Sequence, residues 1–123
     1  MLGRNKVGCI SFSSLAQGVL TDKYLRGIPA DSRAASTRGN GAIEPTMLTE
    51  ELLNKVGQLN KIAEQREQSL AQMALSWVLK DERVTSAIIG ASKPEQVLDS
   101  IQCLRNTSFS KDELNTIDII LAE

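Results

Sequence analysis

Two short apolar segments rich in β-branched residues, at positions 7–12 and 84–89, constrain the fold of this chain most strongly. The composition of the first segment predicts a mostly buried β-strand rather than an amphipathic helix, and that of the second predicts another short β-strand. Between them, residues 27–46 are rich in Gly, Pro, Ser and Arg and lack apolar periodicity, which predicts a long loop. Any fold for this chain must therefore bring together two strands that are far apart in the sequence.

Four helices are predicted by their N-terminal capping residues, because a hydroxyl at the N-cap satisfies free backbone N–H groups of the first turn. The capping residues and their acidic or amide partners are Thr49 with Glu50 and Glu51, Ser69 with Gln72, Ser92 with Glu95, and Ser110 with Glu113. Apolar residues at three- and four-residue steps give each helix a predicted buried face. These are Leu52, Val56, Leu59 and Ala63; Leu70, Met73, Ala74, Trp77 and Val78; Val97, Leu98 and Ile101; and Leu114, Ile117 and Leu121.

The expected order of elements is strand, long loop, helix, helix, strand, helix, helix, which is typical of an α/β protein with parallel strands. The 123 residues suffice for one domain. However, two strands alone would leave exposed sheet edges and too small a sheet core. We therefore expect an incomplete α/β domain that is part of something larger.

Composition excludes several kinds of chemistry. The chain has no His, so a mechanism that needs an imidazole base or a His ligand is excluded within it. Cys9 and Cys103 match no metal-site spacing, and we expect no metal. The net charge of −1 argues against DNA binding by the helix pair around Arg66 and Ser69, and gives no general attraction to membranes. The N-terminal segment is too short and too polar for a signal sequence, so we expect a cytoplasmic location.

A phosphate site is one interpretation of residues 88–95, where a strand leads through Gly90 into a helix start that carries Ser92 and Lys93. The N–H groups and positive dipole end of such a helix suit an anion. An ordinary capped turn without a ligand is an equally good interpretation. On or beside the long loop, Lys23, Arg26, Arg33 and Arg38 either clamp a phosphorylated ligand or are ordinary solvated side chains.

Several separated motifs, in the right order, resemble the aldo-keto reductase family. They are FSSLAQGVLTDKY at residues 12–24, GIP at 27–29, Ser32 and Arg33, MALSWVL at 73–79, and IIGASKPEQVLDSI at 88–101. Members of this family are (β/α)8 TIM barrels that bind NADPH, and the chain resembles about their C-terminal third. The resemblance implies the C-terminal part of such a barrel over residues 1–123, with two parallel strands, about four helices and a cofactor-covering loop at 27–46.

The resemblance also implies a set of cofactor-binding residues. Six residues after the first strand would line the nicotinamide and pyrophosphate: Phe12, Ser13, Ser14, Leu15, Ala16 and Gln17. Lys23 and Arg33 would hold phosphates, and Gly90 and Ser92 would meet the adenosine 2′-phosphate. Gln96, Asp99 and Ser100 would face the adenosine.

No catalytic residue is expected in this chain, because the family's Asp, Tyr, Lys and His constellation lies earlier in the barrel than anything here. Two functional hypotheses follow. The first is the cofactor-binding part of an NADPH-dependent reductase of small carbonyl substrates, inactive alone and completed by a complementary barrel chain or a homo-oligomer. The second is a non-catalytic module that binds a nucleotide or a partner, with its exposed strand edges as the contact surface.

Overall fold

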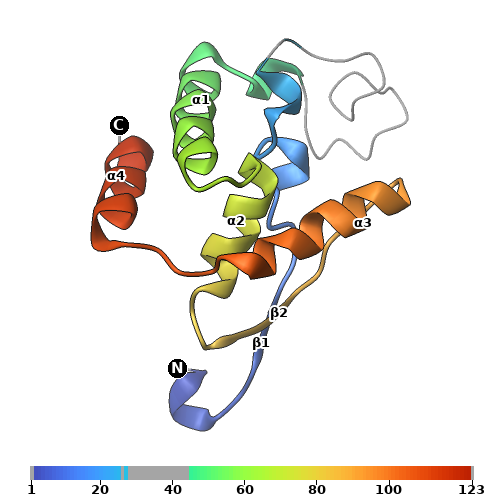
Figure 1. Cartoon of the computed structure of the whole chain (residues 1–123), viewed down its shortest axis with the longest axis vertical. Coiled ribbons are helices and arrows are strands. Elements are labelled where there is room, and N and C mark those ends of the chain that lie inside the picture. Colours follow the sequence, from blue (N-terminus) through green and yellow to red (C-terminus); the bar gives the residue numbers. More distant parts are fainter. Residues whose placement is uncertain (1, 26, 28–44, 123) are drawn as a thin grey trace.

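A computed structural model describes residues 2–25, 27 and 45–122 and contains two strands and four α-helices within them (Figure 1). The strands are β1 (Cys9–Ser11) and β2 (Val84–Ala87), and the helices are α1 (Glu50–Gln65), α2 (Leu70–Leu79), α3 (Pro94–Ile101) and α4 (Lys111–Ala122). Short 3-10 helices accompany them: η1 (Gly3–Asn5), η2 (Ala16–Gly18), η3 (Asp22–Tyr24), η4 (Pro45–Met47) and η5 (Gln102–Arg105). This order confirms the predicted α/β arrangement. Most of the predicted 27–46 loop lies outside the described residues, and its last two positions belong to η4.

The two strands pair in parallel, as the order of elements predicted, with Ile10 opposite Ser86 and Ser11 opposite Ala87. The Ile88 N–H extends the pairing by donating to the Ser11 carbonyl at 2.8 Å. The prediction that the first strand is mostly buried was wrong, because Ile10 is exposed and Phe12, just after β1, is 77% exposed. Helix α2 packs against β2, but no described element covers these two side chains.

Three of the four predicted helix caps are present. Thr49 accepts a hydrogen bond from the Leu52 N–H at 3.1 Å, Ser69 and Gln72 form a capping box, and the Ser110 hydroxyl accepts from the Glu113 N–H at 3.1 Å. In each case a local side chain satisfies a backbone group that the helix leaves unpaired.

The predicted capping box of Ser92 with Glu95 was wrong. Pro94 occupies the first position of α3, so Lys93 is the N-cap residue and makes no side-chain cap. A residue that precedes proline favours extended backbone, which fits the φ of −141° and ψ of 145° at Lys93. The Ser92 N–H donates instead to Gln96 Oε1 at 2.8 Å.

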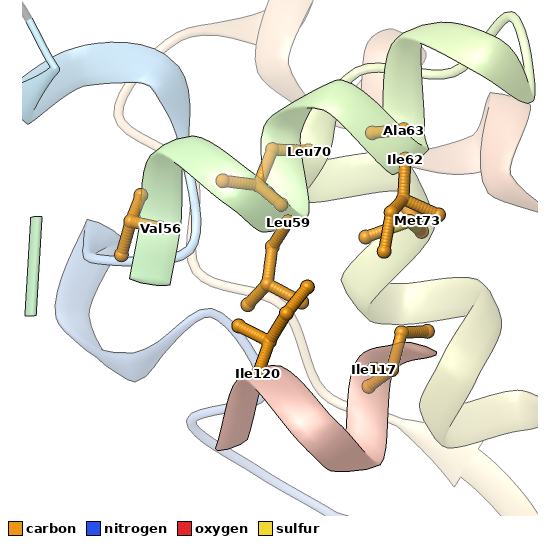
Figure 2. Close-up of a cluster of buried hydrophobic side chains, with 8 residues drawn as sticks. All are labelled: Val56, Leu59, Ile62, Ala63, Leu70, Met73, Ile117 and Ile120. Atoms are coloured by element: carbon orange, nitrogen blue, oxygen red, sulfur yellow. The ribbon is translucent and has the colours of Figure 1, made fainter. Parts of the chain in front are cut away.

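The core lies between α1, α2 and α4 (Figure 2). Their buried side chains point toward one another, and α4 joins the two consecutive helices α1 and α2 from far along the sequence: Val56, Leu59, Ile62 and Ala63 from α1, Leu70 and Met73 from α2, and Ile117 and Ile120 from α4. Tyr24 is also buried and packs against Val19, Leu48 and Leu53. The predicted faces of α1, α2 and α4 thus supply six of the eight side chains of this cluster. Ile62 was not predicted, and Ile120 takes the place predicted for Leu121, which is exposed.

Two other predictions of burial were wrong, at Trp77 on α2 and along the predicted face of α3. Trp77 is 38% exposed rather than part of the core, and the Lys80 ammonium lies 4.0 Å from the centre of its ring. On α3, Val97, Leu98 and Ile101 are all exposed, with Leu98 64% exposed. The apolar spacing on α3 was recognised correctly, but the described chain provides no layer to bury that face.

No described helix combines the length and the apolar character needed to cross a membrane.

Candidate functional site

A cavity of about 830 Å³ lies where three parts of the chain meet. Its walls come from the segment after β1, from the start of α2, and from the β2–α3 connection with α3. The lining residues are Ser13, Leu15, Gln17, Gly18, Thr21, Asp22, Lys23, Ser69, Leu70, Ala71, Gly90, Ser92, Glu95, Gln96, Asp99 and Ser100. Its size falls in the range of sites for small molecules and cofactors.

The first wall has an unusual backbone. Ser13, Ala16 and Gln17 have positive φ angles of 57°, 46° and 61°, and Gly18 follows with 99°. Residues other than glycine rarely adopt such angles, because the backbone is strained there. Residues with such angles persist only where the surrounding structure holds them, and they cluster at functional sites. Thr21 follows these turns and also lines the cavity. The Thr21 hydroxyl donates to the Gly18 carbonyl at 2.7 Å and accepts from the Lys23 N–H at 3.2 Å.

The opposite wall is held together by Gln96. Its Oε1 accepts hydrogen bonds from the Ser92 N–H at 2.8 Å and from the Ser92 hydroxyl at 3.2 Å. The Ser100 hydroxyl donates to the Gln96 carbonyl at 2.7 Å. These polar groups lie at and after the N-terminal end of α3, where the helix dipole favours negative charge. An acceptor atom of a ligand could replace Gln96 Oε1 on Ser92.

The start of α2 is the third wall, and Gln72 joins it to α3. The Gln72 Nε2 group donates to Asp99 Oδ1 at 2.6 Å and to the Asp99 carbonyl at 3.3 Å. Its Oε1 accepts from the Ser69 N–H at 3.1 Å. Asp99 is thus attached to the helix that forms the third wall.

Charge is unevenly distributed around the cavity. Lys23 is the one cationic side chain among the described lining residues, and it lies on the first wall beside Asp22. Glu95 and Asp99 place two carboxylates on the α3 wall. An anionic group is therefore best accommodated near Lys23 or against the Ser92 hydroxyl and N–H, whereas a hydrogen-bond donor suits Asp99.

Nine of the thirteen sequence-predicted cofactor residues line this cavity: Ser13, Leu15, Gln17, Lys23, Gly90, Ser92, Gln96, Asp99 and Ser100. Phe12, Ser14 and Ala16 do not line it; Phe12 is exposed, and the Ser14 hydroxyl lies 3.2 Å from that of Ser11. Arg33, like Arg26 and Arg38, lies outside the described residues.

Sequence reasoning missed several lining residues. Gly18, Thr21 and Asp22 belong to the same motif as the predicted residues, so continuing along that motif would have found them. Glu95 is one residue from Gln96 and could have been found in the same way. Ser69, Leu70 and Ala71 carry no local signal, because only the packing of α2 brings them to the cavity.

The perturbed carboxyl groups lie outside the cavity. The side-chain hydrogen bond from Arg83 holds the pKa of Asp81 well below its usual range. Burial tends to raise the pKa of Glu113, but hydrogen bonds from the Ser110 N–H and from Arg66 outweigh that effect and lower it. The described residues contain no cluster of His, Cys, Asp and Glu suited to a metal ion. Nothing in the perturbed carboxyl groups points to acid–base catalysis at the cavity.

The DNA-binding alternative finds no support at Arg66. Its side chain is only 3% exposed and forms an ion pair with Glu113 at 2.7 Å. It also donates to the Asn106 carbonyl at 3.1 Å and lies 3.7 Å from the centre of the Phe109 ring. Arg66 therefore joins α1 to α4 rather than facing a nucleic-acid backbone.

The fold defines the class of protein first. The strands are parallel, helices follow them, and the structure superimposes on a glycerol dehydrogenase from Gluconobacter oxydans with a TM-score of 0.72 and 27% identity, covering 98% of this chain and 36% of that one. The chain has the fold of the C-terminal part of a (β/α)8 barrel, an incomplete barrel.

The family follows from the sequence comparisons. Residues 1–122 match the model of the aldo/keto reductase family, and the chain belongs to that family of oxidoreductases. It is 55% identical over 124 residues to L-glyceraldehyde 3-phosphate reductase of Escherichia coli O157:H7, covering 99% of this chain and 36% of that protein. It is 38% identical to a Schizosaccharomyces pombe protein named as a voltage-gated potassium channel subunit beta, covering 93% of this chain and 34% of that protein. The chain thus spans about a third of the length of these relatives.

Proposed function

We propose that this chain is the cofactor-binding part of an NADPH-dependent aldo-keto reductase, which reduces a small carbonyl compound to an alcohol. The observation that carries the proposal is the cavity, which joins residues 13–23 to residues 90–100. Both segments supply polar groups to its lining. A dinucleotide needs such groups at its nicotinamide end and at its adenosine end. The family supports carbonyl reduction as the reaction.

Different lining residues suit different parts of NADPH. Lys23 would hold the pyrophosphate, and the left-handed turns of the first wall would place Ser13 and Gln17 near the nicotinamide. The Ser92 N–H and hydroxyl would donate to the 2′-phosphate, which would replace Gln96 Oε1 as their acceptor. Asp99 and Ser100, farther along α3, would face the adenosine. Arg33 would add a second cation from the loop.

When bound, the reduced nicotinamide supplies a hydride. The residues of this chain would bind and orient the cofactor, which is a matter of geometry and electrostatics. Because the chain has no His and we expect no catalytic residue in it, the proton for the alcohol oxygen would come from another part of the complete enzyme. We expect the chain to bind NADPH and to reduce nothing alone.

Calorimetric titration of the purified chain with NADPH, and in parallel with NADH, tests the proposal. Saturable binding that prefers NADPH and weakens as salt concentration rises is the expected result, because phosphate contacts are screened by salt. Ser92→Ala should reduce the preference for NADPH over NADH. Lys23→Ala should weaken the binding of both cofactors at least about tenfold, since a charge-assisted hydrogen bond contributes about 1.5–3 kcal/mol.

Lys61→Ala is the matched control, since Lys61 is exposed on α1 and does not line the cavity. It should bind both cofactors as the unaltered chain does. A folded chain, verified by circular dichroism, that binds neither NADPH nor NADH would overturn the proposed function.

A second candidate function is a partner-binding module, and the exposed apolar side chains favour it. Ile10, Phe12, Ile88 and Leu98 expose apolar surface around the two-stranded sheet and α3. Such a surface is unusual for parallel strands, which are ordinarily covered on both faces. A complementary barrel chain or another copy of this chain would cover it. Sedimentation of the chain, alone and after Phe12→Ser, tests this function, and a monomer in both cases would count against self-association.

We also propose a cytoplasmic location, where the two cysteines, both unpaired in the structure, would remain reduced. Localisation of a tagged chain by cell fractionation would test this.

A further inference from the structure

Gln72 has a double role that its position in a capping box does not explain. Its Oε1 accepts from the Ser69 N–H at 3.1 Å, which serves the start of α2. Its Nε2 reaches across to α3 and donates to Asp99 Oδ1 at 2.6 Å. Because a backbone N–H can only donate, the atom facing Ser69 must be the Gln72 oxygen, and the amide nitrogen must face Asp99.

The consequence for Asp99 is a fixed carboxylate. Asp99 lines the cavity, and Gln72 holds both its Oδ1 and its backbone carbonyl. Among the described residues no hydrogen bond to the other oxygen, Oδ2, is found. An ionised carboxylate accepts hydrogen bonds and donates none, so this oxygen suits a donor on a ligand.

We propose that Gln72 is a positioning residue that orients Asp99 to select an amino group on the bound ligand. This inference rests on the proposed function, in which Asp99 faces the adenosine of NADPH. There the donor is the amino group at C6 of adenine, and a 6-oxo purine, which carries an acceptor at that place, is rejected. A carboxylate that is already held loses less conformational freedom on binding than a free one.

Substitutions that change which atoms at positions 72 and 99 donate and accept hydrogen bonds test the proposal. The unaltered chain should bind NADPH at least about tenfold more tightly than its hypoxanthine analogue, since a hydrogen bond to a charged group contributes about 1.5–3 kcal/mol. In Asp99→Asn, Gln72 still donates to the oxygen at position 99, so the new amide NH2 turns toward the ligand. Calorimetry should then show that the hypoxanthine analogue binds more tightly than NADPH.

The double variant Gln72→Glu with Asp99→Asn should restore the original preference. Glutamate at position 72 keeps the capping box, because it can still accept from the Ser69 N–H. It also accepts from the amide NH2 at position 99, so the amide oxygen of that side chain turns toward the ligand. Both variants retain a hydrogen bond between the two positions, so a difference between them cannot come from the loss of that bond.

Gln65→Glu is the matched control, because Gln65 is exposed on α1 and does not line the cavity. Combined with Asp99→Asn, it should leave the reversed preference unchanged. Equal preferences in Asp99→Asn and in the double variant would overturn the positioning role while leaving NADPH binding intact. Absence of NADPH binding by the unaltered chain would instead overturn the proposed function, and the positioning role with it.

Discussion

Two regions of this molecule, both rich in apolar residues, differ in what surrounds them. The helical region, α1, α2 and α4, buries its apolar side chains between three helices of the chain (Figure 2). The sheet region, β1, β2 and α3, leaves Ile10, Ile88 and Leu98 exposed. The hydrophobic effect stabilises a fold only where apolar surface is removed from water. The same spacing of apolar residues therefore stabilises the helical region more than the sheet region. The stability of this chain is therefore expected to come mainly from the helical region.

The largest expected effect is a truncation in the helical region. Leu59→Ala removes a side chain that is buried against α4, and we expect the free energy of unfolding to fall by about 3 kcal/mol. Ile88→Ala, in the sheet region, should change it by less than about 0.5 kcal/mol. Urea unfolding followed by circular dichroism measures both. Equal losses of unfolding free energy would contradict the difference between the two regions and would mean that Ile88 is buried in an interface.

The ion pair of Arg66 should give the next largest effect. Arg66→Ala removes the link to Glu113, the Asn106 carbonyl and the Phe109 ring. Removing one partner of a fully buried ion pair costs about 3–5 kcal/mol, and since Glu113 is 29% exposed we expect about 2 kcal/mol. Urea unfolding again measures it.

Arg83→Ala is the matched control for that prediction. Its ion pair with Asp81 lies in the sheet region, and the Arg83 side chain is exposed, so the loss should be small. A loss as large as that of Arg66→Ala would show that the turn before β2 contributes more stability than its exposure implies.

The smallest expected effect is the dependence of stability on pH through Glu113. Hydrogen bonds from the Ser110 N–H and from Arg66, acting against burial, lower the pKa of Glu113 below its ordinary value of 4.5. A lowered folded-state pKa stabilises the fold at pH values above the ordinary pKa, and this contribution is lost as the pH falls through the lowered value. The Tm difference between the unaltered chain and Glu113→Gln should therefore be larger at pH 7 than at pH 3. An equal difference at both pH values would contradict the assignment.

Local signals predicted the elements well. Thr49, Ser69 and Ser110 each mark a helix start because a capping hydroxyl and its backbone partner are only three residues apart. The prediction failed at Ser92, where Pro94 moves the start of α3. It also failed for burial on α3 and at Trp77, because apolar spacing shows which face could be buried and not whether anything covers it.

The candidate site was predictable in part for a similar reason. The motif at residues 12–24 and the strand–helix junction at 88–101 could be recognised in the sequence, and the structure brings Lys23 and Gln96 to one cavity. Ser69 at the start of α2 could not be found in this way, nor could the hydrogen bond from Gln72 to Asp99. Those two residues are 27 positions apart, and no local pattern encodes their contact.

The sequence by itself determined the α/β class, the parallel order of strands and helices, and most helix starts, because these depend on spacing and on hydrogen bonds between near neighbours. Only the tertiary structure decided which apolar faces are buried, that α2 forms the third wall of the cavity, and that Gln72 holds Asp99. Such contacts depend on how whole helices pack, and packing is set by the shape of all the surrounding elements together.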